Sequence, residues 1–143
     1  MRQLSLLART FTAGLLLQLL CSCATPKLTL SIPAPEAVGS VEISDGYLDK
    51  KQQHIVYDRK TISDALRLVE GHNSGWSVPF GTFPTPKASA SFNAQDGTVL
   101  FVLWFGPEWI GARSFQGEYN ENVTWAPGND VQQQLRRLFA IGA

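Results

Sequence analysis

The chain contains little of the chemistry that usually marks a catalytic or metal site. It has two histidines, His54 and His72, and two cysteines, Cys21 and Cys23. No HExxH or CxxC spacing, nucleophile elbow, phosphate-binding glycine loop or dinucleotide fingerprint occurs. The residues Asp45, Asp49, His54 and Asp58 could be imagined as a metal cluster, but their spacing fits no calcium loop and is more typical of solvated turns. We therefore expect no metal, no cofactor and no catalytic residues.

Long hydrophobic runs are also missing. The longest apolar block, Phe11 to Leu20, has ten residues. At a helical rise of ~1.5 Å per residue it covers about half of a ~30 Å hydrocarbon core, too little for a permanent membrane span. It follows a basic start, with Arg2 and Arg9 and no acidic residue, and it ends in small residues around a cysteine. This order predicts a secretory signal peptide.

The stretch Leu20-Cys21-Ser22-Cys23 resembles the lipobox of bacterial lipoproteins, in which a branched apolar residue and a small residue precede an obligatory cysteine. The resemblance implies cleavage after Ser22 and attachment of a diacylglyceryl group, with fatty acids such as palmitate, to Cys23. Cys21 departs from the family, which usually has Ser, Thr, Ala or Val there. The alternative is an ordinary signal peptide cut after Ala24, which would leave a soluble protein.

The anchor would place the protein in the cell envelope. Several acyl chains on Cys23 would hold it durably on a membrane. Ala24 after the anchor resembles the family's sorting signal for the outer membrane, if the cell is Gram-negative. Because Cys21 would leave with the signal and Cys23 would carry lipid, no disulfide is expected. Removal of both leader arginines leaves a slightly acidic chain, which argues against a nucleic-acid partner.

We expect three parts: a signal peptide over residues 1–22, a proline-containing tether over 23–39 and a single domain over 40–143. The tether carries Pro26, Pro33 and Pro35, and prolines favour extended conformations. The alternation of Leu28, Leu30 and Ile32 leaves open an edge strand that pairs with the domain.

The domain is predicted to be α+β, a small antiparallel β-sheet in a hairpin meander with two helices packed on one face. Strands are expected at 41–43, 55–57, 88–94, 98–105 and 108–115, with a hairpin at Asp96-Gly97. One helix should start at Thr61 as its cap and stop at a left-handed Gly71. The second should be capped by Asn129 or Asp130. Their inner faces are predicted to be Ile62, Ala65, Leu66 and Val69 in the first, and Val131, Leu135, Leu138 and Phe139 in the second.

Residues 99–105 of the strand predicted at 98–105 are apolar on both faces, so both should be covered. The helices would cover one face. The other would be covered by residues 115–125, by the loop 76–86 or by a second molecule.

Two aromatic features are candidates for partner contact. The first is Trp76, Phe80 and Phe83 in a proline-rich loop, which would suit a partner protein or sugar, although we favour the interpretation that they cover the second sheet face. The second is Trp104 and Trp109 around a Gly-Pro turn. They could pair across the strands, which we favour, or form a ligand platform.

Three functions remain open. We favour a non-catalytic, lipid-anchored accessory domain that binds an envelope protein or polymer. The alternatives are a compact inhibitory or structural module that uses the hairpin tip 104–109, and an unrecognised enzyme with a pocket that joins His54 or His72 to carboxylates.

Overall fold

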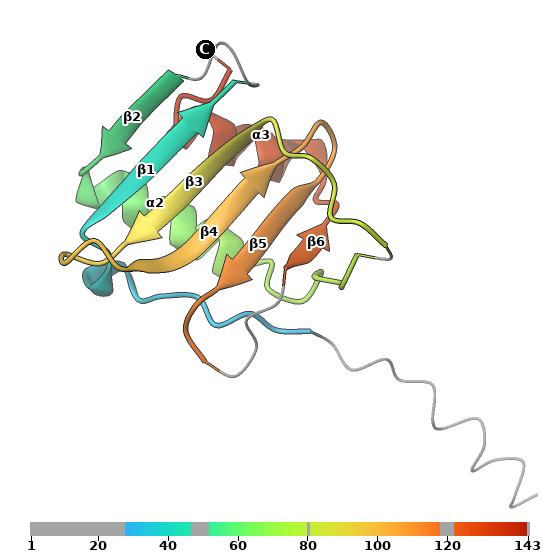
Figure 1. Ribbon diagram of the computed structural model, residues 1–143, viewed down its shortest axis with the longest axis horizontal. Coiled ribbons are helices and arrows are strands. Elements are labelled where there is room, and N and C mark those ends of the chain that lie inside the picture. The colour runs from blue at the N-terminus through green and yellow to red at the C-terminus, as the bar shows by residue number, and fades with distance from the viewer. Residues whose placement is uncertain (1–27, 47–51, 80, 118–121, 143) are drawn as a thin grey trace, which may run out of the picture.

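The computed structural model describes residues 28–46, 52–79, 81–117 and 122–142 (Figure 1). The candidate lipidation site Cys23 and the candidate contact residue Phe80 lie outside these ranges. In chain order the elements are the 3-10 helix η1 (Pro35–Ala37), β1 (Ser40–Asp45), β2 (Gln52–Val56), α2 (Arg59–Glu70), β3 (Ala88–Asn93), β4 (Val99–Phe105), β5 (Ile110–Ser114), β6 (Val123–Trp125) and α3 (Asn129–Leu138).

The strands form one six-stranded antiparallel sheet in the order β2-β1-β3-β4-β5-β6. Helices α2 and α3 both lie behind the sheet in Figure 1, and β4 lies in its interior. The predicted α+β class with two helices on one face is thus confirmed. The helices of the described ranges are too short or too polar to cross a membrane.

The helix-covered face of the sheet carries the hydrophobic core. Alternate residues of β3 and β4 are fully or almost fully buried there, among them Phe92, Phe101 and Phe105. Phe139, which follows α3, meets two of these rings in edge-to-face geometry, at 5.9 Å from Phe92 and 6.5 Å from Phe105 between ring centroids. Each such burial stabilises the fold by roughly 1.5–3 kcal/mol, enough to dock α3 on the sheet.

Helix α2 begins earlier than predicted, since its N-cap lies three residues before Thr61. Its N-cap is Asp58, whose Oδ2 accepts hydrogen bonds from the Thr61 amide at 2.9 Å and the Thr61 hydroxyl at 2.7 Å. A carboxylate caps a free helix amide at least as well as a hydroxyl. Asp58 is therefore the N-cap, and Thr61 donates hydrogen bonds to it. The predicted inner face is confirmed, since Ile62, Ala65, Leu66 and Val69 are buried.

The other helix ends also differ from the prediction. Gly71 ends α2 with φ −60°, in the right-handed region, so its left-handed conformation was wrongly predicted. Its amide still bonds the carbonyl of Arg67, which closes the last turn. Helix α3 is capped by Gly128 without a side-chain hydrogen bond, so neither Asn129 nor Asp130 is the cap. Gly97 does take the left-handed conformation, with φ +85°, in the predicted β3–β4 hairpin.

The segment before β1 packs on the domain, so the folded unit starts earlier than the predicted Ser40. Leu30 is 3% exposed and Val38 is fully buried. The Asn73 side chain pairs with the backbone of Leu30, through Leu30 N–H to Oδ1 at 3.0 Å and Nδ2–H to the Leu30 carbonyl at 2.9 Å. The alternative prediction was an edge strand over Leu28, Leu30 and Ile32, and it forms as a single bridge between Leu28 and Trp76. Residues 28–39 are therefore part of the fold, and a free tether can extend only over the residues before Leu28.

Candidate functional site

One face of the sheet carries no helix over the described residues (Figure 1), and we call it the open face. Strand alternation and register assign the residues that point to it. Towards β1 they are mostly small and polar, whereas β4 contributes apolar side chains. From β1 to β6 they are Ser40, Glu42, Ser44, Ser89, Ser91, Asn93, Leu100, Val102, Trp104, Gly111, Arg113 and Thr124.

Three aromatic rings gather on the open face, and we call them the aromatic cluster: Phe83, Trp104 and Trp109. The Phe83 ring meets Trp104 at 5.1 Å and Trp109 at 5.6 Å between centroids, both edge-to-face. This is a favourable geometry for aromatic pairs, worth about 0.5–1.5 kcal/mol beyond burial. All three rings are only partly buried. The cluster is therefore fixed within the chain and still presents surface to solvent.

Gly111 explains why Phe83 can dock between the two tryptophans. A Cβ on Gly111 would lie 2.5 Å from Cζ of Phe83, so only glycine leaves room for the ring. Trp104 lies opposite Gly111 in the register of β4 and β5. The favoured cross-strand pair of Trp104 and Trp109 is thus wrong, because Trp109 lies before β5 and meets Trp104 through Phe83.

The hairpin tip between β4 and β5 is held by α3. Its Gly106 carbonyl accepts hydrogen bonds from Gln132 Nε2 at 2.7 Å and Arg136 Nη2 at 2.9 Å. The Trp109 ring covers Gly106 so closely that any Cβ there would overlap it. Gln132 is itself 5% exposed, so its hydrogen bond is protected from water. The tip is a rigid structure, with Pro107 and Glu108 exposed at its end.

A second aromatic group on the open face was not predicted. The Arg113 guanidinium lies 4.9 Å from the centroid of the Phe115 ring, a cation–π contact. Phe115 is 48% exposed. Buried Nε of Arg113 and buried Oδ1 of Asn93 have no hydrogen-bond partner among the described residues. The alternation of side chains along β5 could have indicated this group, because Arg113 and Phe115 are two positions apart and so point to the same side.

Trp76 lies on the other side of the molecule, in the core. It is 5% exposed and meets Trp125 at 5.4 Å between centroids, and Trp125 in turn stacks on His72 at 5.5 Å. Trp76 therefore neither covers the open face, as we favoured, nor is offered to a partner. Of the predicted contact residues, the structure thus brings Phe83, Trp104 and Trp109 together and separates Trp76 from them.

The perturbed ionisable groups belong to local structure and not to the open face. Hydrogen bonds from Thr61 lower the pKa of Asp58, and those from Thr98 lower the pKa of Asp96. The ion pair with Asp64 raises the pKa of Lys60. The described residues contain no group of three His, Cys, Asp or Glu close enough to hold a metal. Of the imagined metal cluster, Asp58 caps α2 and Asp45 binds the Gly142 amide, while Asp49 lies outside the described ranges.

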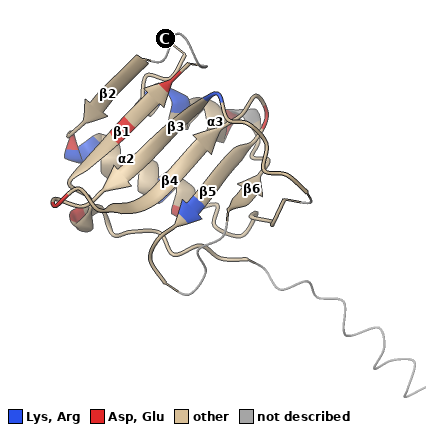
Figure 2. Ribbon diagram, viewed as in Figure 1, with Lys and Arg blue, Asp and Glu red and all other residues tan. Residues whose placement is uncertain are grey.

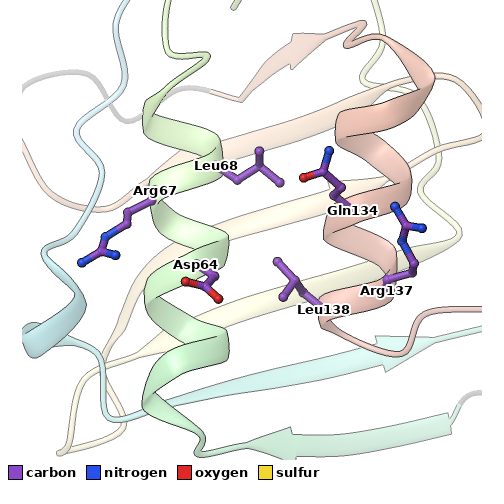
Figure 3. Close-up of a pocket in the computed structure, with 6 residues that line it drawn as sticks. All are labelled: Asp64, Arg67, Leu68, Gln134, Arg137 and Leu138. Atoms are coloured by element: carbon purple, nitrogen blue, oxygen red, sulfur yellow. The ribbon is translucent and has the colours of Figure 1, made fainter.

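A groove of about 580 Å³ lies between α2 and α3, on the side of the molecule away from the open face (Figure 3). Leu68 and Leu138 point towards each other across it. Asp64, Arg67 and Arg137 also line it, and the Arg67 side chain points away from α3 (Figure 3). It contains none of the predicted contact residues and neither histidine.

Comparison of the chain with protein-family models, with curated proteins and with solved structures finds no match.

Proposed function

We propose that this protein is a lipid-anchored, non-catalytic component of a bacterial cell envelope that binds a partner protein through the open face. The observation that carries the proposal is the one-sided sheet. Its helices cover one face, whereas on the other β4 carries Leu100, Val102 and Trp104, of which Leu100 and Trp104 are partly exposed and Val102 is 8% exposed. The open face is polar along β1 and β3, so the part that a partner would cover is formed by the apolar side chains of β4 and the aromatic cluster.

The composition of the open face suits a protein partner. Tryptophan, phenylalanine and arginine are the residues enriched at the centres of protein interfaces, and this face joins the aromatic cluster to Arg113 and Phe115. The cluster is fixed by its own contacts, so little side-chain entropy would be lost on binding. Six strands at ~4.8 Å spacing make the face about 24 Å wide, a suitable size for a small specific interface.

A sugar platform would need free ring faces. Here Phe83 stands edge-to-face against both tryptophans, which occupies part of each indole. An envelope polymer is for that reason the less favoured partner.

The test places a photo-crosslinking amino acid at one position of each face in the native cell. Ser91 lies on β3 in the middle of the open face, and Gln134 is exposed on α3 as the matched control. We expect protein adducts from position 91 and none from position 134. Equal labelling from both positions, no adduct from position 91, or an adduct that glycan hydrolases degrade and proteases do not would contradict the proposal.

The anchor is tested in the same cells. The lipobox predicts that radioactive palmitate labels the protein and that Cys23→Ala abolishes the label. An unlabelled wild-type protein would contradict the lipid anchor and leave the binding experiment to be judged separately.

The rigid tip favours one alternative, an inhibitory or structural module whose Pro107 and Glu108 enter another protein. The support is the double hydrogen bond to the Gly106 carbonyl from Gln132 and Arg136. Under this alternative, a photo-crosslinker at position 108 would give the adduct and position 91 would not. The two positions therefore distinguish the two modes of binding.

A further inference from the structure

Strand β2 forms one edge of the sheet and is exposed to solvent. All residues from 52 to 55 are exposed, Ile55 at 52%, and Tyr57 just after the strand is 66% exposed. The other edge strand, β6, is paired on its outer side, because Ser77 bonds Thr124 with N–O distances of 2.9 and 2.8 Å. An exposed edge strand presents backbone N–H and C=O groups that another strand can bind. Of the two edges, β2 is therefore the one at which a further strand can pair.

The ladder between β1 and β3 shows which residues of β2 direct their backbone groups outwards. The Gly46 N–H donates to the Lys87 carbonyl at 3.2 Å, and these two residues face each other where the β1–β3 register continues. Because bonded pairs alternate along an antiparallel ladder, the even-numbered residues of β1 bond β3 and the odd-numbered ones bond β2. His54 faces an odd-numbered residue of β1 and so bonds that strand. Its neighbours Gln53 and Ile55 therefore direct their N–H and C=O groups to the free edge.

The side chains at this edge lie on the open face. Ile55 faces Glu42 of β1, whose side chain points to the open face, and residues that face each other across a ladder share a side. By strand alternation Gln53 lies on the same side, and so does Tyr57 where the extended chain continues. The open face thus ends in an exposed isoleucine between a glutamine and a tyrosine.

We propose that β2 pairs with β2 of a second copy of this chain, antiparallel about a two-fold axis at Ile55. Ile55 then faces Ile55 of the second copy, and Gln53 faces Tyr57. These residues direct their backbone groups to the free edge, so each facing pair can exchange both N–H···O bonds. The two isoleucines bury against each other apolar surface that is exposed in the single chain.

The symmetry and charge of β2 favour a second copy as the occupant. A two-fold axis turns the strand into the antiparallel neighbour that this sheet requires, so the pairing is self-complementary. Residues 53–57 are uncharged, and β2 is tan along its length in Figure 2. The nearest charged residues in the sequence, Lys51 and Asp58, flank the facing segment. Residues 53–57 therefore place no like charges opposite each other, which would oppose self-pairing.

The pairing enlarges the open face. The axis stands perpendicular to the sheet, so the open faces of both copies lie on the same side, and two six-stranded sheets become one. The contact itself is small, about 17 Å of strand for five residues at ~3.4 Å each. Small interfaces are typical of weak complexes, so the dimer is best detected at native density in the cell. The pairing depends on the sheet and not on the lipid anchor or the partner of the proposed function.

The experiment adds one cysteine to the full chain in the native strain and treats intact cells with a short bismaleimide, which links two nearby thiols. Ile55→Cys is the test. Gln53→Cys is the control for register, because its two copies would lie four residues apart along the paired strands, about 14 Å. Val78→Cys is the control for exposure, since Val78 is 54% exposed and lies next to Ser77 at the other edge. The wild-type chain controls for Cys21 and Cys23.

We expect a covalent dimer from position 55 in several-fold higher yield than from position 53, and none from position 78 or from the wild type. Equal yields from positions 55 and 53, a dimer from position 78, or no dimer from position 55 would overturn the proposal. An adduct of position 55 with a different protein in place of the dimer would also overturn it.

A second variant, Gln53→Pro in the Ile55→Cys chain, tests the backbone pairing. The N–H of residue 53 does not bond β1, so proline there leaves the β1–β2 ladder in place and removes a donor from the free edge. We expect the cross-link to fall several-fold while the protease resistance of the domain stays unchanged. A cross-link of unchanged yield would overturn the pairing. Should proline unfold the domain, the yields at positions 55, 53 and 78 decide.

Discussion

Replacing Leu30 with alanine tests whether the segment before β1 belongs to the folded unit. Leu30 is 3% exposed and lies in the hydrophobic core, so its truncation removes buried apolar groups. Transfer of these groups alone is worth about 2 kcal/mol. Buried leucine-to-alanine changes cost roughly 2–5 kcal/mol once the cavity is included. Leu30 lies in a peripheral segment that can partly collapse, so we expect a loss of about 2–3 kcal/mol.

The measurement is urea unfolding of residues 24–143, followed by tryptophan fluorescence. Thr29→Ala is the matched control, because Thr29 is exposed and adjacent. It should change the free energy of unfolding by no more than about 0.5 kcal/mol. A free tether would leave Leu30 equally exposed in the folded and unfolded states. If Leu30→Ala and Thr29→Ala behave alike, the docking of this segment is refuted.

Three further predictions concern the site and the first helix. Gly111→Val should displace the Phe83 ring and cost about 1–3 kcal/mol by overpacking, visible as a changed tryptophan emission; an unchanged emission would argue against the docked ring. Gln132→Leu removes one donor to the Gly106 carbonyl and should cost about 1 kcal/mol in urea unfolding, and a gain in stability would contradict the clamp. The folded state lowers the pKa of Asp58 below 3.8, so the carboxylate stabilises the fold above that pH and loses this effect as the pH falls through the lowered value. The stability difference between wild type and Asp58→Asn should therefore shrink below about pH 3.8, and a constant difference would refute the capping role.

The main elements could be predicted because their signals are local. The stripe Ile62, Ala65, Leu66 and Val69 identifies the buried side of a helix whatever the helix packs on. The run 99–105 is apolar on both faces, which predicts an interior strand, and β4 is one. The N-caps were wrongly predicted because several residues near the start of a helix can act as its N-cap. Asp58 and Thr61 are both suitable, and only the backbone path decides which one caps.

The candidate site could be predicted only in part. Trp104 and Trp109 stood out as aromatics around a turn, but the ring that joins them comes from a loop more than twenty residues earlier. Nothing local to Phe83 indicates that Gly111 will leave it a place. The pairing of Asn73 with the Leu30 backbone could not be predicted either. The Asn73 side-chain amide bonds the N–H and C=O of Leu30, as a neighbouring strand would, and the two residues are 43 positions apart in the sequence. β6 has three residues, too few for a recognisable alternation.

The lipid on Cys23 is the claim on which the proposed localisation depends. Intact mass spectrometry of the protein extracted from native membranes tests it most directly. The account predicts a chain that starts at Cys23 and carries a diacylglyceryl group on its sulfur. A mature chain that starts at another residue, or an unmodified Cys23, would contradict it.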